Sequence, residues 1–479
     1  MGTAAPLASL PYRHRVGDVA STPAVTLAAS ATLGQLATTL ADLGISSVVI
    51  DDGDGLPRGI LTERDVLRAV ATGGGDALAA PVAAYMSAPV ETVAADAFLH
   101  VALARMARTG RAHLVVTGPD GRIVGVVTAR GLLRRRVGEA LVLGDQVAAA
   151  TDAAGLAEAV ALLPATARAL RDDGMAAHVI AAVIAATIRD VTGRAADLAA
   201  NAMEAQGHGP APAPWACLVL GSAGRGETLL VPDQDNALIW RDGAADSADA
   251  WFAALGDRMT AMLDAAGIPL CKGGVMASNP HWRGSLATWR ARVDGWLARH
   301  RPEDLLDVDI FFDMAVVAGD HELGTTLQGA AVAAAQSQPV FLKLLGERAG
   351  ERGTPFGLFG SLRTEGGRID LKRSGLLPLV AAARVAALAQ GELATATRDR
   401  LQATAPRVNA ETREALAEAH ELLLGAILDQ QITDIAAGTP ASNRVALAPL
   451  SRATRRRLTE ALHALDGLPL VVRDLLRAD

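Results

Sequence analysis

The sequence contains few cysteines and few aromatic residues. Only two cysteines, Cys217 and Cys271, occur among 479 residues, which excludes a disulfide framework and offers no spacing typical of a zinc site. We therefore expect a reducing, cytoplasmic environment. Aromatic residues make up 3% of the chain and apolar residues 50%. The cores must then be built mainly from Ala, Val and Leu, which favours closely packed helices.

The sequence also lacks an excess of positive charge. The formal net charge is −7, so no basic field attracts phosphate backbones, and nucleic acid is not an expected partner. The longest apolar runs, 174–188 and 376–389, are interrupted by polar residues or proline and fall short of the roughly 20 residues that cross a bilayer. We predict no membrane span, and the N-terminus has no apolar core of signal-peptide length.

An internal repeat occupies residues 16–136. The first copy ends in G-I-L-T-E-R-D-V-L-R at 59–68 and the second in G-V-V-T-A-R-G-L-L-R at 125–134. Thr62 and Thr128 therefore lie 66 positions apart (128 minus 62), each after a β-branched run and before a helical pattern. The repeat predicts two tandem units of one α/β fold.

The strand-turn-strand-threonine-helix order resembles a pair of CBS domains, which we place at 10–137. The resemblance implies an adenine nucleotide bound in the cleft between the units, and a homodimer. It assigns ribose and phosphate contacts to Thr62 and Asp65 in the first unit. The second unit keeps Thr128 but has Gly131 at the aspartate position, which implies one impaired site. Alternatively, Thr62 simply caps a helix that has Asp65 in its first turn.

The rest of the chain alternates between helical and mixed patterns. Residues 138–206 carry apolar positions at helical spacing and are interpreted as a helical linker region. The Pro-rich segment 207–214 marks the start of a domain expected to span 207–320. A C-terminal helical bundle is expected at 321–479. Its helices are predicted near 322–336, 338–350, 375–391, 395–403, 410–436 and 451–475.

Residues that carry chemistry follow the Pro-rich segment. A buried strand at 216–220 breaks at Gly221 and Ser222, and a second strand is expected to present Asp233 and Asp235. Residues i and i+2 of a strand point to the same face, so the two carboxylates should lie side by side. Because like charges so close repel each other, a divalent cation is the simplest partner for them.

The residues just before this acidic pair suit a phosphate. Gly221 allows the backbone to approach a phosphate closely, Ser222 offers a hydroxyl and an amide, and Arg225 adds positive charge within reach. Together these groups suit nucleotidyl transfer, in which Mg²⁺ held by the acids orients an NTP and neutralises the departing pyrophosphate.

The pattern G-S-x-G-R-x-E followed by D-x-D resembles the polymerase-β nucleotidyltransferase superfamily. The wording D-Q-D-N-A-L-I, the later C-K-G-G-V-M-A-S-N-P-x-W-R at 271–283 and the preceding CBS pair are similar to bacterial nucleotidyltransferases related to the uridylyltransferases of nitrogen-signalling proteins. The resemblance covers nearly the whole chain. It implies a nucleotidyltransferase domain with a mixed sheet and a C-terminal helical substrate-binding domain, and it names no substrate.

A third carboxylate is expected on a neighbouring strand, sought within 307–319. Asp313 is the first choice, because the related families keep an acidic residue near this place, before a glycine that is here Gly319, and Asp309 is the second. The relatives carry an arginine two positions later, where this chain has Ala315. Asp313 is therefore predicted to complete the metal ligands.

Lysine is scarce, with Lys272, Lys343 and Lys372 as the only ones. Lys272 precedes two glycines and is a candidate for contacting the triphosphate or acceptor, although a solvated surface lysine has the same pattern. Lys372 forms with Asp370 either an ion pair facing the active site or an ordinary surface pair.

Three functional hypotheses follow. The leading one is an Mg²⁺-dependent enzyme that transfers a nucleoside monophosphate from an NTP to a hydroxyl of a protein or small molecule, regulated by an adenine nucleotide at the CBS pair. The second is a nucleotide-sensing scaffold without catalysis, which Gly131 and Ala315 favour. The third, a nucleic-acid polymerase or tRNA-modifying enzyme, is opposed by the acidic net charge.

Overall fold

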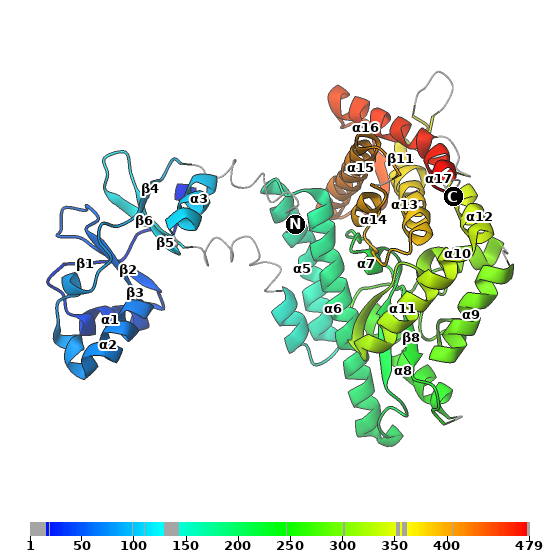
Figure 1. Ribbon diagram of the computed structural model, residues 1–479, viewed down its shortest axis with the longest axis horizontal. Coiled ribbons are helices and arrows are strands. Elements are labelled where there is room, and N and C mark those ends of the chain that lie inside the picture. Colours follow the sequence, from blue (N-terminus) through cyan, green and yellow to red (C-terminus); the bar gives the residue numbers. More distant parts are fainter. Residues whose placement is uncertain are drawn as a thin grey trace. The chain divides into compact units, whose positions relative to one another are not determined.

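The computed structural model divides the chain into two compact units, residues 1–139 and 140–479 (Figure 1). Each unit is described by itself. The structure describes residues 16–18, 20–97, 99–109, 111–128, 143–245, 247–299, 302–350, 355–356, 362–405 and 407–476.

The first unit contains the predicted repeat. Each half has a three-stranded sheet in which the first two strands pair in parallel and the last two antiparallel. The strands are β1 (Thr26–Leu27), β2 (Ser47–Ile50) and β3 (Gly59–Thr62), then β4 (Thr92–Ala94), β5 (His113–Thr117) and β6 (Ile123–Thr128). The helices are α1 (Leu33–Leu43), α2 (Glu63–Gly73) and α3 (Leu99–Thr109).

The two halves share an apolar cluster at equivalent positions. Val49 pairs with Ile60 between β2 and β3, and Val115 pairs with Val126 between β5 and β6. All four belong to one buried cluster, and each pair is offset by 66 positions (115 minus 49, 126 minus 60). The sequence repeat is therefore also a repeat of strand register, in which one sheet face of each half packs against the other.

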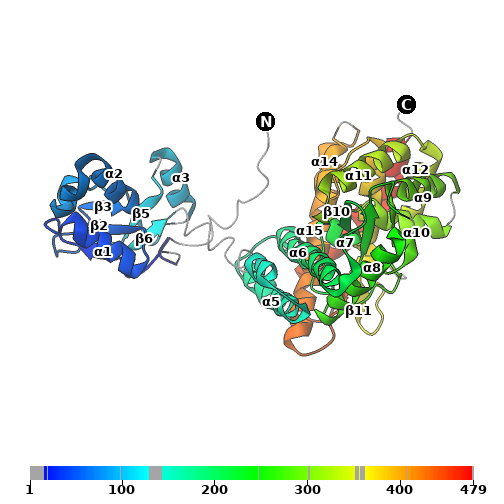
Figure 2. The same ribbon diagram turned by 90° about the horizontal axis from the view of Figure 1, so that it is seen from below.

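The second unit is built around a mixed four-stranded sheet of order β10-β7-β8-β9. The β8–β9 pair is parallel and the other pairs are antiparallel. Nearly all residues of β7 and β8 are buried, because helices pack around the sheet (Figure 2). The strands are β7 (Trp215–Val219), β8 (Asn236–Trp240), β9 (Arg283–Ser285) and β10 (Ala315–Gly319).

The region predicted as a linker packs onto this sheet. Helices α5 (Ala153–Asp172) and α6 (Ala177–Met203) contribute to the same apolar core as the strands. At Gly193 a Cβ atom would lie 2.4 Å from the carbonyl oxygen of Val317, so α6 touches the backbone of β10. Residues 140–206 consequently belong to the compact unit that also holds the 207–320 region.

Five of the six predicted C-terminal helices agree with the structure to within two residues at each end, whereas the predicted helix at 451–475 is divided into α16 and α17. The chain between β8 and β10 carries α8 (Ala248–Ala265), α9 (Leu286–Arg299) and α10 (Pro302–Phe311). The bundle contains α11 (His321–Gln336), α12 (Pro339–Gly350), α13 (Leu377–Ala389), α14 (Thr397–Ala403), α15 (Ala410–Ala436), α16 (Arg452–Ala464) and α17 (Leu468–Leu476). A short antiparallel pair, β11 (Arg368–Asp370) with β12 (Arg444–Ala446), was not predicted.

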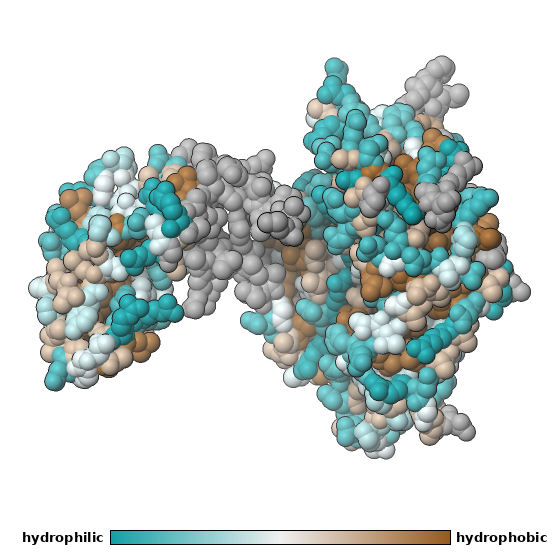
Figure 3. Space-filling view, viewed as in Figure 1, coloured by the Kyte–Doolittle hydropathy of each residue, from teal (hydrophilic) through white to brown (hydrophobic). Residues whose placement is uncertain are grey.

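The surface of the second unit and the apolar helix α5 bear on whether the chain crosses a membrane. On the visible face of the second unit, hydrophilic and hydrophobic residues are interspersed (Figure 3). Of the described helices, only α5 has the length and apolar composition of a membrane span. Of the apolar stretch of α5 that has this composition, 33% is buried inside the protein. A core helix of a soluble protein passes the same test, so this is weak evidence for a span.

Candidate active site

Two aspartates and a cysteine converge at the entrance to β8. One ligand atom each from Asp233, Asp235 and Cys271 lies within 4.8 Å of the others. The aspartates stand just before β8 rather than on it, since β8 begins at Asn236. They nevertheless come together, as the i, i+2 spacing predicts. This is the only three-residue group of possible metal ligands among the described residues.

The residues that alternate with the aspartates hold this segment in place. Gln234 is buried and donates from Nε2 to the carbonyl oxygens of Thr260, at 3.1 Å, and Ile268, at 2.9 Å. Asn236 is buried and accepts from the backbone N–H of Ala277 at 2.9 Å. The inward amides therefore fix the backbone, while the alternate carboxylates face the opposite way.

The predicted glycine–serine bend lies directly beside the acidic pair. Gly221 has φ +59°, and a Cβ atom there would lie 2.6 Å from the Oδ2 atom of Asp235. The Leu220 N–H donates to the carbonyl oxygen of Asp235 at 2.8 Å. Ser222 is the second residue of the short helix α7 (Gly221–Arg225), and its hydroxyl lies 2.8 Å from that of Thr228. Glycine is required here both by its φ and by the close approach of a carboxylate.

Charge accumulates at this site. Burial, followed by the neighbouring Asp233, raises the pKa of Asp235 to about 7, although Cys271, Lys372 and Arg225 oppose the shift. Burial and the adjacent Asp235 raise the pKa of the Cys271 thiol to about 11. Because the pKa of Asp235 is raised beside Asp233, ionisation of both carboxylates costs free energy, and a bound cation lowers this cost. The ligand atoms therefore fit a divalent ion.

Both candidate lysines can now be placed. Lys372 follows β11 and is close enough to Asp235 to favour its ionised form. The Oδ1 atom of Asp370 instead accepts from the backbone N–H of Arg373 at 3.0 Å. Lys272 is exposed beside Cys271. Lys372 therefore brings an ammonium group from the C-terminal region to the acidic pair.

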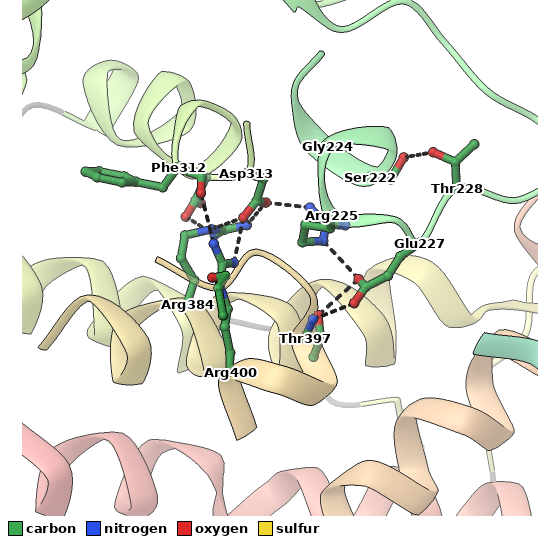
Figure 4. Close-up of polar contacts among 12 residues, drawn as sticks. Ser222, Gly224, Arg225, Glu227, Thr228, Phe312, Asp313, Arg384, Thr397 and Arg400 are labelled. Carbon is green, nitrogen blue, oxygen red and sulfur yellow. Dashed lines mark hydrogen bonds and ion pairs between the residues drawn. The ribbon is translucent and has the colours of Figure 1, made fainter. Parts of the chain in front are cut away.

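Asp313 is not a metal ligand in this structure, which corrects the prediction. It is fully buried, and three guanidinium groups bind its two carboxylate oxygens (Figure 4). Arg225 donates to Oδ2 at 2.5 Å, Arg384 to both oxygens at 3.1 and 2.5 Å, and Arg400 to Oδ1 at 2.6 Å. Burial alone would raise the pKa of Asp313, but the three arginines hold it well below its usual range. We call these four residues the Asp313 cluster.

The second choice and the predicted strand need the same correction. Asp309 accepts from Arg384 at 2.6 Å and lies on α10. Residues 302–311 are helical, and the strand begins only at Ala315. The alternating aspartates of the 307–313 segment therefore do not share a strand face.

Arg225 belongs to the Asp313 cluster, and its predicted contact with a phosphate stays a prediction. Besides Asp313, its Nε atom donates to Glu227 at 2.9 Å, and the guanidinium is buried. Glu227 accepts from the N–H and hydroxyl of Thr397 at 2.6 and 3.0 Å. Burial would raise the pKa of Glu227, but His420 and Arg225 hold it below its ordinary value. These contacts join the turn that follows Ser222 to the C-terminal helices (Figure 4).

A pocket lies between this turn and the C-terminal helices. Ser222 and Lys372 line it on the side of the acidic pair, and leucines and valines of both regions form much of its wall. Its other polar lining residues are Arg225, Glu227, His420 and Asn443. No sequence pattern predicts this pocket, because its walls come from segments far apart in the chain, such as those of Ser222 and His420.

In the first unit, the predicted nucleotide residues line one cleft between the two halves. Thr62, Asp65 and Thr128 all border it. The N–H and hydroxyl of Thr62 donate to the Oδ2 atom of Asp65 at 2.9 and 2.8 Å, so the helix-capping role proposed as an alternative is present as well. Gly131 lies outside the described residues. The cationic lining residues are Arg64, Arg68 and Arg111.

Comparisons with known families agree with this architecture. Residues 16–72 and 82–138 match the CBS domain. Residues 161–303 match the family described as "Putative nucleotidyltransferase DUF294", and residues 339–474 match its "Putative nucleotidyltransferase substrate binding domain". The chain thus contains a CBS pair, a domain that matches this nucleotidyltransferase family model and the substrate-binding domain described with that family. The family match begins within α5, which agrees with the packing of α6 on the sheet.

Two curated relatives and a solved structure each match about a quarter of this chain. An uncharacterized 17.7 kDa protein of Acidianus ambivalens is 29% identical over 25% of this chain and 71% of its own length. An uncharacterized protein of Methanopyrus kandleri is 32% identical over 25% of this chain and 61% of its own length. A CBS domain protein from Pyrobaculum aerophilum, solved with AMP, is 33% identical over 25% of this chain and 90% of that chain, with a TM-score of 0.23. At that TM-score the structural likeness carries no argument.

Proposed function

We propose that this chain transfers a nucleoside monophosphate from an NTP to a hydroxyl group of a protein or small molecule, in a reaction that depends on a divalent cation, with Mg²⁺ as the expected ion. The observation that supports this most is the convergence of Asp233 and Asp235 beside the Gly221–Ser222 bend. The family match to nucleotidyltransferase domains supports the same reaction class.

Each group has a role that follows from its chemistry. Asp233 and Asp235 would hold the cation, which when bound supplies charge neutralisation for the triphosphate and activation of the attacking hydroxyl. The backbone and hydroxyl of Ser222 offer hydrogen bonds to phosphate oxygens. Lys372, near Asp235, would neutralise charge on the phosphates. The Asp313 cluster would keep α7, and with it the bend, in position.

The CBS pair is proposed to regulate this activity by binding an adenine nucleotide. The cleft in the first unit offers carboxylate and hydroxyl groups for ribose at Asp65, Thr62 and Thr128, and guanidinium groups for phosphate. Asp65→Ala should weaken AMP or ATP binding to the full chain, measured by calorimetry, and should change the dependence of activity on that nucleotide. A homodimer and a cytoplasmic location remain part of the proposal.

The activity can be tested by label transfer. The full chain is incubated with Mg²⁺ or Mn²⁺, cell extract and each of ATP, UTP, GTP and CTP carrying an α-phosphate label. One NTP should label an acceptor, and the double variant Asp233→Asn, Asp235→Asn should abolish the signal. Asp257→Asn, the same change at an exposed residue of α8, is the matched control. Absence of label with every NTP, or full labelling by the double variant, refutes the proposal.

A second candidate, a nucleotide-sensing scaffold without catalysis, is favoured by one observation. Of the described residues, only two carboxylates belong to the cluster, and its third member is a thiol. The scaffold predicts AMP or ATP binding that Asp65→Ala abolishes, together with no divalent cation bound at Asp233 and Asp235. If the wild type binds a divalent cation and the double variant Asp233→Asn, Asp235→Asn does not, the result favours the enzyme over the scaffold.

A further inference from the structure

We infer that Cys271 is a direct sulfur ligand of the cation held by Asp233 and Asp235, and that the site therefore takes a borderline divalent cation of the Co²⁺ and Zn²⁺ class in preference to the Mg²⁺ that the proposed function expects. This inference rests on the proposed function, because it concerns the same site. It goes further by naming a ligand and the chemical class of the ion.

The geometry puts the sulfur where a third ligand belongs. Its Sγ atom lies within 4.8 Å of a carboxylate oxygen of each aspartate. The thiolate is the form of cysteine that binds metal, and a bound cation stabilises that form by its positive charge.

The loop that carries Cys271 is tied to β8, the strand that directly follows the aspartates. The Asn236 N–H donates to the carbonyl oxygen of Val275 at 3.0 Å, and the Gly274 N–H closes a turn onto the carbonyl oxygen of Cys271 at 3.0 Å. The sulfur is thus fixed relative to the acidic pair by backbone hydrogen bonds. The two other candidates for the third place are occupied, since Asp313 and Asp309 both accept from arginines.

The ligand set decides the class of ion. Mg²⁺ takes oxygen ligands almost exclusively, whereas a thiolate favours softer first-row ions such as Co²⁺ and Zn²⁺. Coordination forms one metal–sulfur bond and breaks the S–H bond, and the proton leaves to solvent. Two carboxylates and one thiolate leave further coordination positions open for phosphate oxygens.

The chain supplies its own control, because it has only one other cysteine. Cys217 lies on β7, is fully buried and contacts the sulfur of Met259 at 3.7 Å. It is not a member of the ligand group. Any spectroscopic signature of a metal–sulfur bond at the acidic pair must therefore vanish with Cys271 and survive without Cys217.

The test is a Co²⁺ titration of the metal-free full chain, followed by the near-ultraviolet sulfur-to-cobalt charge-transfer band. Wild type and Cys217→Ala should develop the band with one Co²⁺ per chain. Cys271→Ser should bind Co²⁺ without the band and at least about tenfold more weakly. The Asp233→Asn, Asp235→Asn variant should show neither the band nor the binding. Calorimetry with Co²⁺ measures the affinities independently of any absorption.

The outcomes separate this inference from the proposed function. Co²⁺ binding without a band in wild type, or a band that persists in Cys271→Ser, overturns the sulfur ligand and leaves the acidic pair as a cation site. Unchanged Co²⁺ binding by the double aspartate variant overturns both proposals. Cys271→Asp gives a second check, since a third carboxylate should raise the affinity for Mg²⁺ relative to Co²⁺ by about tenfold or more.

Discussion

Asp313 and the pair Asp233–Asp235 are carboxylates of the same unit in opposite surroundings. Asp313 is fully buried, and three arginines bind its two oxygens. Asp233 is exposed and Asp235 only partly buried. Their closest described neighbours include each other and a thiol. The positive charge around Asp313 exceeds its own negative charge, whereas the positive charge around the pair is smaller than the charge of the two ionised carboxylates.

The surroundings of these carboxylates distinguish a structural role from a functional one more clearly than their residue type does. A buried acid with a full set of cationic partners is satisfied without any ligand, so its removal should damage the fold. Burial and the neighbouring Asp233 raise the pKa of Asp235, so the ionised pair is a cost to the folded protein unless a cation is present. The comparison predicts that stability and cation binding respond in opposite ways to substitution at the two places.

The largest effect on stability is expected for Asp313→Ala. The substitution leaves Arg225, Arg384 and Arg400 buried without their shared partner and should cost about 3–5 kcal/mol of unfolding free energy. Tryptophan fluorescence in denaturant measures this, because all six tryptophans lie at or beyond residue 215 and report on the second unit. Asp309→Ala, at a carboxylate that is 30% exposed, should cost about 1 kcal/mol or less. Equal costs would show that Asp313 is not the centre of the cluster.

An intermediate effect is expected for Glu421→Gln. Glu421 on α15 accepts from the N–H groups of Ala177 and His178, at 2.6 and 3.2 Å, and so caps α6, whose own N-cap residue is Ala176. Losing this charged cap should cost about 1–2 kcal/mol. Glu418→Gln, at an exposed residue one turn earlier on the same helix, is the control and should be nearly neutral.

The same residue gives a pH test. Burial would raise the pKa of Glu421, but its hydrogen bonds with His178 and the two amides lower it to about 2. A depressed carboxyl pKa contributes stability that is present above about pH 4.5 and is lost as the pH falls towards 2. Unfolding midpoints of wild type and Glu421→Gln should therefore converge between these values. A difference that stays constant with pH would contradict the assignment.

The smallest effect on stability, with the opposite sign, is expected for Asp235→Asn in metal-free protein. The folded pKa of about 7 lies above the ordinary value of 3.8, so ionisation destabilises the folded state increasingly as the pH rises from about 4 to about 7. At pH 8 the variant should equal wild type or gain up to about 1 kcal/mol. A loss of several kcal/mol would make Asp235 a structural residue like Asp313. The same variant should lose divalent-cation binding in calorimetry.

Local patterns were enough to predict most of the fold. The register repeat of the first unit follows from β-branched runs and the two threonines, and α15 was predicted with its observed bounds, 410–436. The acidic pair and the Gly221 bend were found because their spacing fixes their geometry within about 15 residues of chain. Strand β9, only three residues long, and the β11–β12 pair give no comparable periodic signal.

The arginine contacts of Asp313 could not be predicted, because the arginines come from distant segments of the chain. Arg384 and Arg400 lie 71 and 87 positions further along the chain, and only the packing of α13 and α14 brings them to the end of α10. The position of Cys271 beside the acidic pair was not predicted either. The available signal was its position immediately before Lys272 and the two glycines, a loop that the sequence had already indicated as part of the site.

The second glycine of the G-S-x-G motif has a consequence for genetic screens. A Cβ atom at Gly224 would lie 1.7 Å from the carbonyl oxygen of Asp313, and the Gly224 carbonyl itself accepts from Arg189. An alanine at this position would abolish activity by steric displacement of α7 and would be scored as the loss of a nucleotide-binding residue. Separating the two explanations requires a thermal melt beside every activity assay, since only a misfit of this kind lowers both readings together.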